Sequence, residues 1–249
     1  MHEKNLEWQD KLLISNEQKH LEDWYLEINP NGVVPTLIVD KQKPIFESSA
    51  IMEYLEDEYP ETSLRPKSNN AIAQMRAWIA LVDHLTTPAV RYPSFQYGGL
   101  LLKFKSLSKD EFLSKIEKRP LKSEFYREMD QDIGFTEEKI QTALKAIRKT
   151  VERLEYLLEE SKGPWIMGEV FTLCDIVVGP LLDRIEDLGL EYIWTSKYPL
   201  VSLWLKSFQD RPSVKKAFYS GSRLSEMFPE LNLGTGVRKD TVEHYLNGT

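Results

Sequence analysis

The segments NPNGVVPTL, residues 29–37, and ESSAIMEYL, residues 47–55, decide the fold of this chain. In the first segment, a Val-Pro peptide lies between a glycine turn and an apolar strand. A short hairpin then leads to an acidic residue and two serines at the start of a helix. Together the two segments can offer one small peptide a free backbone edge and a helix N-terminus that attracts anions.

The Val34-Pro35 peptide is the first candidate binding element. Only about 5–6% of the bonds before proline are cis, so a trans proline that opens an edge strand is the simpler interpretation. The NPNG turn before this peptide and the hairpin after it nevertheless favour the cis form. We therefore expect a cis bond, with Val34 offering its main chain to a ligand.

Glu47 and Ser48 form the second candidate element, at the mouth of a predicted helix. A helix N-terminus has unpaired N–H groups and a partial positive charge, so it can hold a carboxylate, to which Ser48 would add its hydroxyl. In the alternative, Ser48 or Ser49 is only an N-cap and Glu47 is solvated. The position of this pair shortly after Val34-Pro35 favours ligand binding.

Strand signals stop after the first quarter of the chain. Strands are predicted at 6–14, 36–39 and 45–46, and helices at 20–28 and 49–58. Beyond a polar linker at 62–70, the periodic segments are all helical and lie at 71–85, 136–159, 173–188 and 200–208. Between them, prolines and glycines interrupt short helical pieces at 92–134, and the polar stretch from residue 232 is expected to be a loose tail.

The composition is that of a folded protein and excludes some classes of partner. Hydrophobic residues make up 41% and charged residues 29% of the 249 positions, which argues against long disorder. The net charge of -7 disfavours nucleic acid as a partner, because phosphate binding needs a basic surface. No apolar run is long enough to span a membrane. A single cysteine cannot form an intramolecular disulfide, so we expect a reducing, cytoplasmic compartment.

The sequence FTLCDI, residues 171–176, predicts a structural cap. Thr172 as N-cap and Asp175 three residues later form a variant of the capping box at the start of an apolar helix. Cys174 lies in the first turn, where the pKa of a thiol can fall, but its apolar neighbours favour a buried, inert thiol. The four histidines are scattered and far from this cysteine, so no metal site is predicted.

These motifs resemble those of the cytosolic glutathione transferase family, and the resemblance extends over most of the chain. The matching features are the Val34-Pro35 and Glu47-Ser48 elements, the linker with Leu64-Arg65-Pro66, and the Thr172 and Asp175 cap. Within the family, the segment 106–138, which contains IEKRPLKSEF and GFTEEKI, is similar to bacterial relatives that include β-aryl etherases and glutathione-dependent dehalogenases.

The resemblance implies a two-domain α+β/α fold. A glutathione-binding thioredoxin-like domain would occupy residues 1–62, an all-helical bundle residues 71–231, and a polar tail residues 232–249. A complete thioredoxin-like domain has the order βαβαββα, whereas this chain reads βαββα. We therefore expect that the first strand and most of the first helix, about 20 residues, lie outside the sequence. In the family the turn between them supplies the group that activates the thiol, so no catalytic residue can be named.

The resemblance also implies a role for each candidate residue. The main chain of Val34, next to a cis Pro35, would pair with the cysteinyl backbone of glutathione. Glu47 would face the γ-glutamyl ammonium group, and Ser48 the free carboxylate of that residue. His20 could reach the glycyl carboxylate, for which many relatives use a lysine just before the Val-Pro pair, where this chain has a valine. An exposed histidine that caps a helix is the commoner alternative.

The implied function is that of a glutathione transferase acting in detoxification, with glutathione as co-substrate and no metal. It would direct the glutathione thiolate at a small hydrophobic electrophile, by conjugation or by cleavage of an ether or halide. The family also implies a homodimer in which the helix at 71–85 packs against the partner's small domain. The alternative is a non-catalytic transferase-like module that binds ligands or partners. The intact glutathione elements favour the enzyme, and the missing turn favours the module.

Overall fold

The computed structural model describes residues 1–13, 18–40 and 42–247. The chain divides into two compact units. The first unit combines residues 5–60 with residues 101–135, and the second contains residues 2–4, residues 61–100 and the chain from residue 136 onward. The first unit therefore includes a segment that is distant in sequence. The domain limits at residues 62 and 71 stay predictions.

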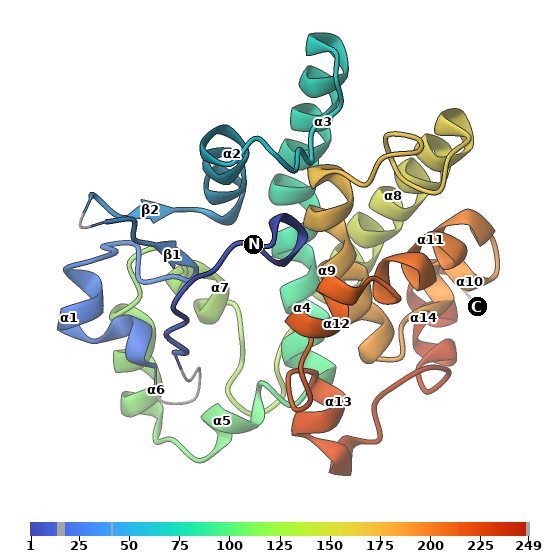
Figure 1. The fold of residues 1–249 in the computed structure, drawn as a ribbon. Helices are drawn as coiled ribbons and strands as arrows, with labels where there is room; N and C mark the ends of the chain where they lie inside the picture. The colour runs from blue at the N-terminus through green and yellow to red at the C-terminus, as the bar shows by residue number, and fades with distance from the viewer. Residues whose placement is uncertain (14–17, 41, 248–249) are drawn as a thin grey trace. The chain divides into compact units, whose positions relative to one another are not determined.

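The first unit is built on a short antiparallel hairpin. Strand β1 (Thr36–Leu37) pairs with β2 (Ile45–Phe46) in a register that sets Thr36 opposite Phe46. Helix α2 (Ser48–Glu58) follows and packs against β2 (Figure 1). The 3-10 turn η3 (Lys19–Leu21) and the short helix α1 (Asp23–Leu26) precede the hairpin.

Three short helices from the later segment complete the first unit: α5 (Leu102–Lys105), α6 (Lys109–Glu117) and α7 (Ser123–Arg127). Ser108 starts α6 in a capping box, in which its backbone N–H donates to the carboxylate of Glu111 over 2.8 Å. The three helices share an aromatic core, where Phe104 meets Phe112 and Tyr126 edge to face. The predicted interrupted segment is thus an ordered helical insert.

Two predictions for the first unit are wrong. The strand expected at 6–14 is absent over residues 6–13, and residue 14 lies outside the described residues. A strand needs a partner for its N–H and C=O groups, and the described residues supply none there, so Trp8 and Leu12 remain exposed. The helix expected at 20–28 is broken in two, because Glu22 has an extended backbone with φ −77° and ψ 150°.

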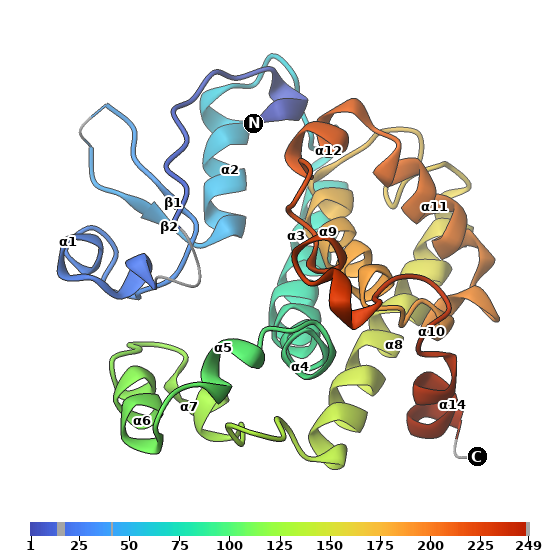
Figure 2. The same cartoon turned by 90° about the horizontal axis from the view of Figure 1, so that it is seen from below.

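The second unit is a helical bundle centred on α8 (Glu137–Ser161), which corresponds to the helix predicted at 136–159. Thr136 caps this helix by accepting a hydrogen bond from Lys139 N over 3.4 Å. The other elements of the unit are η1 (His2–Lys4), α3 (Asn69–Leu81), the π-helical turn η4 (Val82–Thr86), α4 (Thr87–Tyr97), α9 (Leu173–Asp187), α10 (Tyr192–Thr195), α11 (Pro199–Gln209), α12 (Pro212–Ala217), α13 (Leu224–Met227), η5 (Pro229–Leu231) and α14 (Lys239–Asn247). Helices α4, α11 and α14 pack against α8 (Figure 2).

The helix predicted at 71–85 is longer than expected. Helices α3 and α4 are joined through η4 without a loop. Pro88 lies in the first turn of α4, directly after the π-helical turn η4, and does not end the helical run. The Thr86 hydroxyl in η4 lies 2.7 Å from that of Thr150, so this buried junction is tied to α8.

The loose tail expected from residue 232 is wrong, because residues 239–247 form α14. Val242 on this helix is fully buried. Gln141 and Arg148 of α8 donate hydrogen bonds, each of 3.1 Å, to the C=O groups of Tyr245 and Leu246. A polar composition concealed the buried valine that anchors the helix.

Candidate functional site

The turn before β1 presents the Val34-Pro35 peptide on the surface of the first unit. This bond is cis, as predicted, and Val34 is 59% exposed. Within the described ranges, the main chain of Val34 takes part in no backbone hydrogen bond. Its N–H and C=O groups are therefore available to an extended peptide that would add to this edge.

A buried polar clamp holds the turn that carries this peptide. The hydroxyl of Tyr25 donates to the C=O of Val33 over 2.7 Å and lies 2.8 Å from the Thr36 hydroxyl. The side-chain amide of Asn29, which has no exposed surface, donates to the same two oxygens over 2.8 and 3.0 Å. Val33 is thus fixed while Val34 stays unpaired. Sequence periodicity marks Tyr25 only as a core residue, so the clamp is a finding of the structure.

Glu47 joins β2 to α2 with an unusual backbone conformation. Its φ of 64° with ψ of 120° is rare for a residue with a side chain and costs about 1–3 kcal/mol. Glu47 takes the N-cap position, but its side chain makes no capping hydrogen bond. Ser48 is the first helical residue, and both side chains are exposed. No acidic residue occupies the first turn of α2, so this helix start can attract an anion.

His20 lies half-buried in η3, facing a second cation. Its Nε2 atom is 3.5 Å from Nη1 of Arg119. Burial lowers the pKa of His20 to about 4, with further lowering by the charges of Arg119, Lys103 and Lys122. The imidazole is therefore neutral at pH 7. For a carboxylate bound near His20, the positive charge would therefore come from Arg119. The sequence analysis did not single out this arginine.

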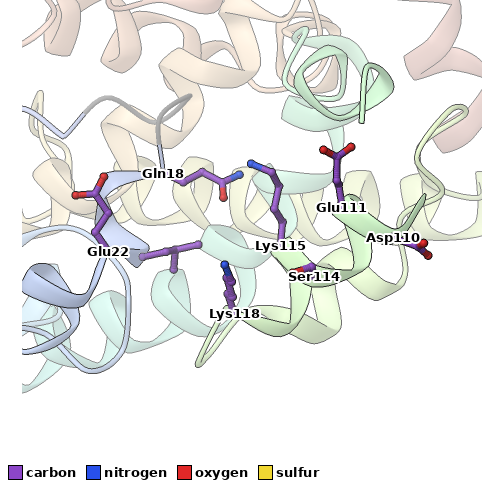
Figure 3. A pocket seen from close by; sticks show the side chains of 8 residues that line it. Gln18, Glu22, Asp110, Glu111, Ser114, Lys115 and Lys118 are labelled. Carbon is purple, nitrogen blue, oxygen red and sulfur yellow. The ribbon is translucent and has the colours of Figure 1, made fainter. Parts of the chain in front are cut away.

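A pocket of about 470 Å³ opens in the same unit, between the η3 region and α6 (Figure 3). Lys115 points from α6 toward Gln18, and Lys118 also lines the pocket (Figure 3). Acidic side chains, including Glu22 and Glu111, line it as well. A lining with charges of both signs does not suit a hydrophobic electrophile. Val34, Pro35, Glu47, Ser48 and His20 are absent from this lining.

Asp175, in the second unit, is fully buried and accepts four hydrogen bonds. Its Oδ2 accepts from the N–H and the hydroxyl of Thr172 over 2.9 and 3.2 Å. Its Oδ1 accepts from Ile166 N over 3.1 Å and from Trp204 Nε1 over 2.8 Å. The neighbouring Cys174 is also fully buried, and burial raises the pKa of its thiol. These contacts stay inside the fold and have the geometry of a structural cap.

Two further features concern the described part of the chain as a whole. None of its helices is both long and apolar enough to cross a membrane. Its His, Cys, Asp and Glu side chains do not gather in groups of three or more that could hold a metal ion.

Comparison with known proteins relates both units to one family. Residues 1–58 match the family model of the glutathione S-transferase N-terminal domain, and residues 118–221 match that of the C-terminal domain. The chain is 30% identical to protein LigF of Sphingobium sp. (strain NBRC 103272 / SYK-6) over 229 residues, which cover 90% of this chain and 88% of that relative. It is 27% identical to glutathione S-transferase GstB of Escherichia coli (strain K12), over 77% of this chain and 76% of GstB.

The solved structures add a direct comparison of the fold. The crystal structure of beta-etherase LigF from Sphingobium sp. strain SYK-6 matches with a TM-score of 0.78 and 29% identity, over 87% of this chain and 90% of that one. The predicted fold class, a thioredoxin-like domain followed by a helical domain, is confirmed. The predicted similarity to β-aryl etherases is confirmed as well.

Proposed function

This chain belongs to the glutathione S-transferase family, and from that premise we propose that it cleaves aryl ethers with glutathione as the attacking co-substrate. The prediction of a glutathione transferase is confirmed by the family and its named relatives. The ether as substrate class rests on one observation, the likeness to beta-etherase LigF over most of both chains.

The exposed edge at Val34 supports a binding mode for the tripeptide. Its main chain pairs with the cysteinyl backbone of glutathione as a short added strand. The start of α2 and the Ser48 hydroxyl hold the γ-glutamyl carboxylate, while Glu47 faces the ammonium group of the same residue. The lack of an acidic residue in the first turn of α2 supports this assignment, since a carboxylate there would repel the ligand.

The reaction needs glutathione as a thiolate, because a neutral thiol is a poor nucleophile at pH 7. The sulfur bonds to the carbon that carries the ether oxygen, and the C–O bond breaks with its electron pair on oxygen. The aryloxide then leaves and takes up a proton. The residues of this chain contribute by holding the tripeptide in one orientation beside the acceptor. We assign none of the described residues to the deprotonation of the thiol.

A two-fold homodimer is the second part of the proposal. The exposed face of α3 carries Ala73, Ala77 and Leu81 at intervals of four residues, and this narrow apolar stripe would let a helix or sheet of a second copy approach closely. Sedimentation at micromolar protein concentration should show a dimer, and a monomer alone would reject this part. A cytoplasmic location, which the lone cysteine supports, completes the proposal.

Activity measurements on the full chain test the proposed reaction. The protein is incubated with a neutral β-aryl ether, with and without glutathione. Phenol release that requires glutathione, with an equal amount of glutathione thioether formed, is the expected result. Turnover of an aryl halide without cleavage of the ether would retain the transferase and reject the ether as substrate. Glutathione binding without consumption of either acceptor would favour the non-catalytic module.

A further inference from the structure

Arg119 of the first unit is buried although it carries a charge. It directly follows Lys118, the C-cap residue of α6, and only 7% of its surface is exposed. The centre of its guanidinium lies 4.0 Å from the ring centre of Tyr126. Its Nε atom has no hydrogen-bond partner among the described residues. A buried charge that lacks a counter-ion is costly, so a site of this kind is complete only with an anion.

The groups that face this guanidinium are neutral or positive. His20, at 3.5 Å, is uncharged at pH 7. Burial and the charge of Arg119 lower the pKa of Lys103 to about 8, which leaves most of it protonated at pH 7. Lys122 adds to the positive potential that acts on His20. Within the described chain, no carboxylate acts on Arg119, so the field at this point favours an anionic ligand.

The same segment lies against the turn that presents Val34. A Cβ atom added to Gly32 would stand 3.0 Å from Cδ of Pro120, the residue after Arg119. Gly32 precedes Val34 by two residues and has a φ of 58°. An extended peptide spans about 3.3 Å per residue. When the middle residue of an extended tripeptide pairs with Val34, each end residue lies about 3.3 Å further along the backbone. Both ends of the tripeptide are therefore close to the turn that contains Gly32.

We propose that Arg119 binds a carboxylate, and that the glycyl carboxylate of glutathione is the group it takes. The inference rests on the proposed glutathione site and assigns the end of the tripeptide that Val34, Glu47 and Ser48 leave open. A guanidinium can give two parallel hydrogen bonds to a carboxylate, which matches its unpaired Nε and its terminal nitrogens. His20, as acceptor from Nη1, is then a positioning residue that orients the guanidinium.

Binding measurements with a modified tripeptide test this assignment. Calorimetric titration compares glutathione with its glycyl amide, in which the terminal carboxylate is replaced by a neutral carboxamide. The wild-type chain should prefer glutathione by about 10- to 100-fold, the range expected for a charge-assisted bond. Arg119→Gln should reduce this ratio to near 1, and Arg119→Lys should restore part of it. Arg127→Gln, at an exposed arginine of α7, is the matched control and should keep the full ratio.

The outcomes separate the two sources of a carboxylate. The ratio is measured within one protein, so a loss of folded material cancels. If Arg119→Gln keeps the full preference for glutathione over its glycyl amide, the glycyl assignment is wrong. In that case the turnover of two ether acceptors that differ only by a carboxylate is compared between the wild type and Arg119→Gln. Lower turnover of the acidic acceptor alone would place its carboxylate at Arg119. No difference in either comparison would overturn the proposal. A wild-type chain that binds neither form of the tripeptide would instead refute the proposed function, and this inference with it.

Discussion

Asp175 in the second unit and Arg119 in the first are both buried ionisable side chains, but only Asp175 is satisfied by its own fold. In the second unit, Asp175 accepts hydrogen bonds from Thr172, Ile166 and Trp204. In the first unit, Arg119 keeps an Nε atom without a partner among the described residues. A polar group whose bonds are all made internally serves folding, whereas one held open in a buried position is suited to bind a group from outside. By this contrast, Asp175 contributes to stability, and Arg119 is suited to ligand binding.

The largest effect is expected from Asp175→Ala. The change leaves the indole N–H of Trp204 and two backbone N–H groups without an acceptor in a dry core. It should lower the free energy of unfolding by about 3–5 kcal/mol, as measured by urea denaturation. Glu160→Ala, at an exposed position of α8, is the control and should change it by less than about 0.5 kcal/mol. A loss below about 1 kcal/mol for Asp175→Ala would remove one side of the comparison.

A pair of serines at helix starts, one in each unit, gives the next largest effect. Ser48→Ala should weaken retention on immobilised glutathione by about 1–3 kcal/mol, because a hydrogen bond to a carboxylate is lost. Ser68→Ala removes the cap of α3, where the hydroxyl accepts from Ala71 N over 3.2 Å. That change should cost about 1 kcal/mol of stability and leave retention unaltered. If Ser48→Ala likewise leaves retention unaltered, the Ser48 hydroxyl has no role in binding glutathione.

Arg119→Met should have a smaller effect on stability than Asp175→Ala or Ser68→Ala. An apolar side chain of similar length removes a buried charge that has no counter-ion, and this gain offsets the lost contact with Tyr126. We expect the free energy of unfolding, measured without glutathione, to stay within about 1 kcal/mol of the wild-type value or to rise. A loss as large as that of Asp175→Ala would show that Arg119 is structural, and the comparison would fail.

The smallest effect concerns the pH dependence that His20 contributes. Its pKa of about 4 in the folded chain lies below the ordinary value of 6.5, so between these values the unfolded chain binds more protons. The contribution of His20 is therefore favourable above pH 6.5 and is lost as the pH falls toward 4. His20→Gln should lose less Tm than the wild type between pH 7 and pH 4.5, by about 2–4 °C, since the side chain is half-exposed. Parallel loss in both proteins would contradict the neutral, buried imidazole.

Local patterns predicted the parts of the molecule that depend on neighbouring residues. The cis Val34-Pro35 bond and the start of α2 follow from a turn, a proline and a serine pair within a few positions. The strand expected at 6–14 failed because alternation in a sequence does not tell whether a partner strand is present. The tail was misjudged because one valine, Val242, anchors α14 within a polar run.

Long-range contacts account for the features that the sequence did not predict. Arg119 and His20 are 99 positions apart, and nothing in the surrounding letters IEKRP marks this arginine as buried. The clamp of Tyr25 and Asn29 on Val33 is a shorter example, since both residues also fit an ordinary helix and turn. Such groups are recognisable only when burial and hydrogen-bond partners are known.

The first unit is assembled from two stretches of chain, 5–60 and 101–135, with α3, η4 and α4 between them in sequence. On the ribosome, the hairpin emerges well before the helices α5, α6 and α7 that complete its unit. Residues 5–60 therefore cannot complete their packing against residues 101–135 until residue 135 has left the exit tunnel, and until then the apolar side chains of that contact stay uncovered. A fragment that stops at the linker would remain in that unfinished state, and chaperones that bind exposed apolar surface would meet it there.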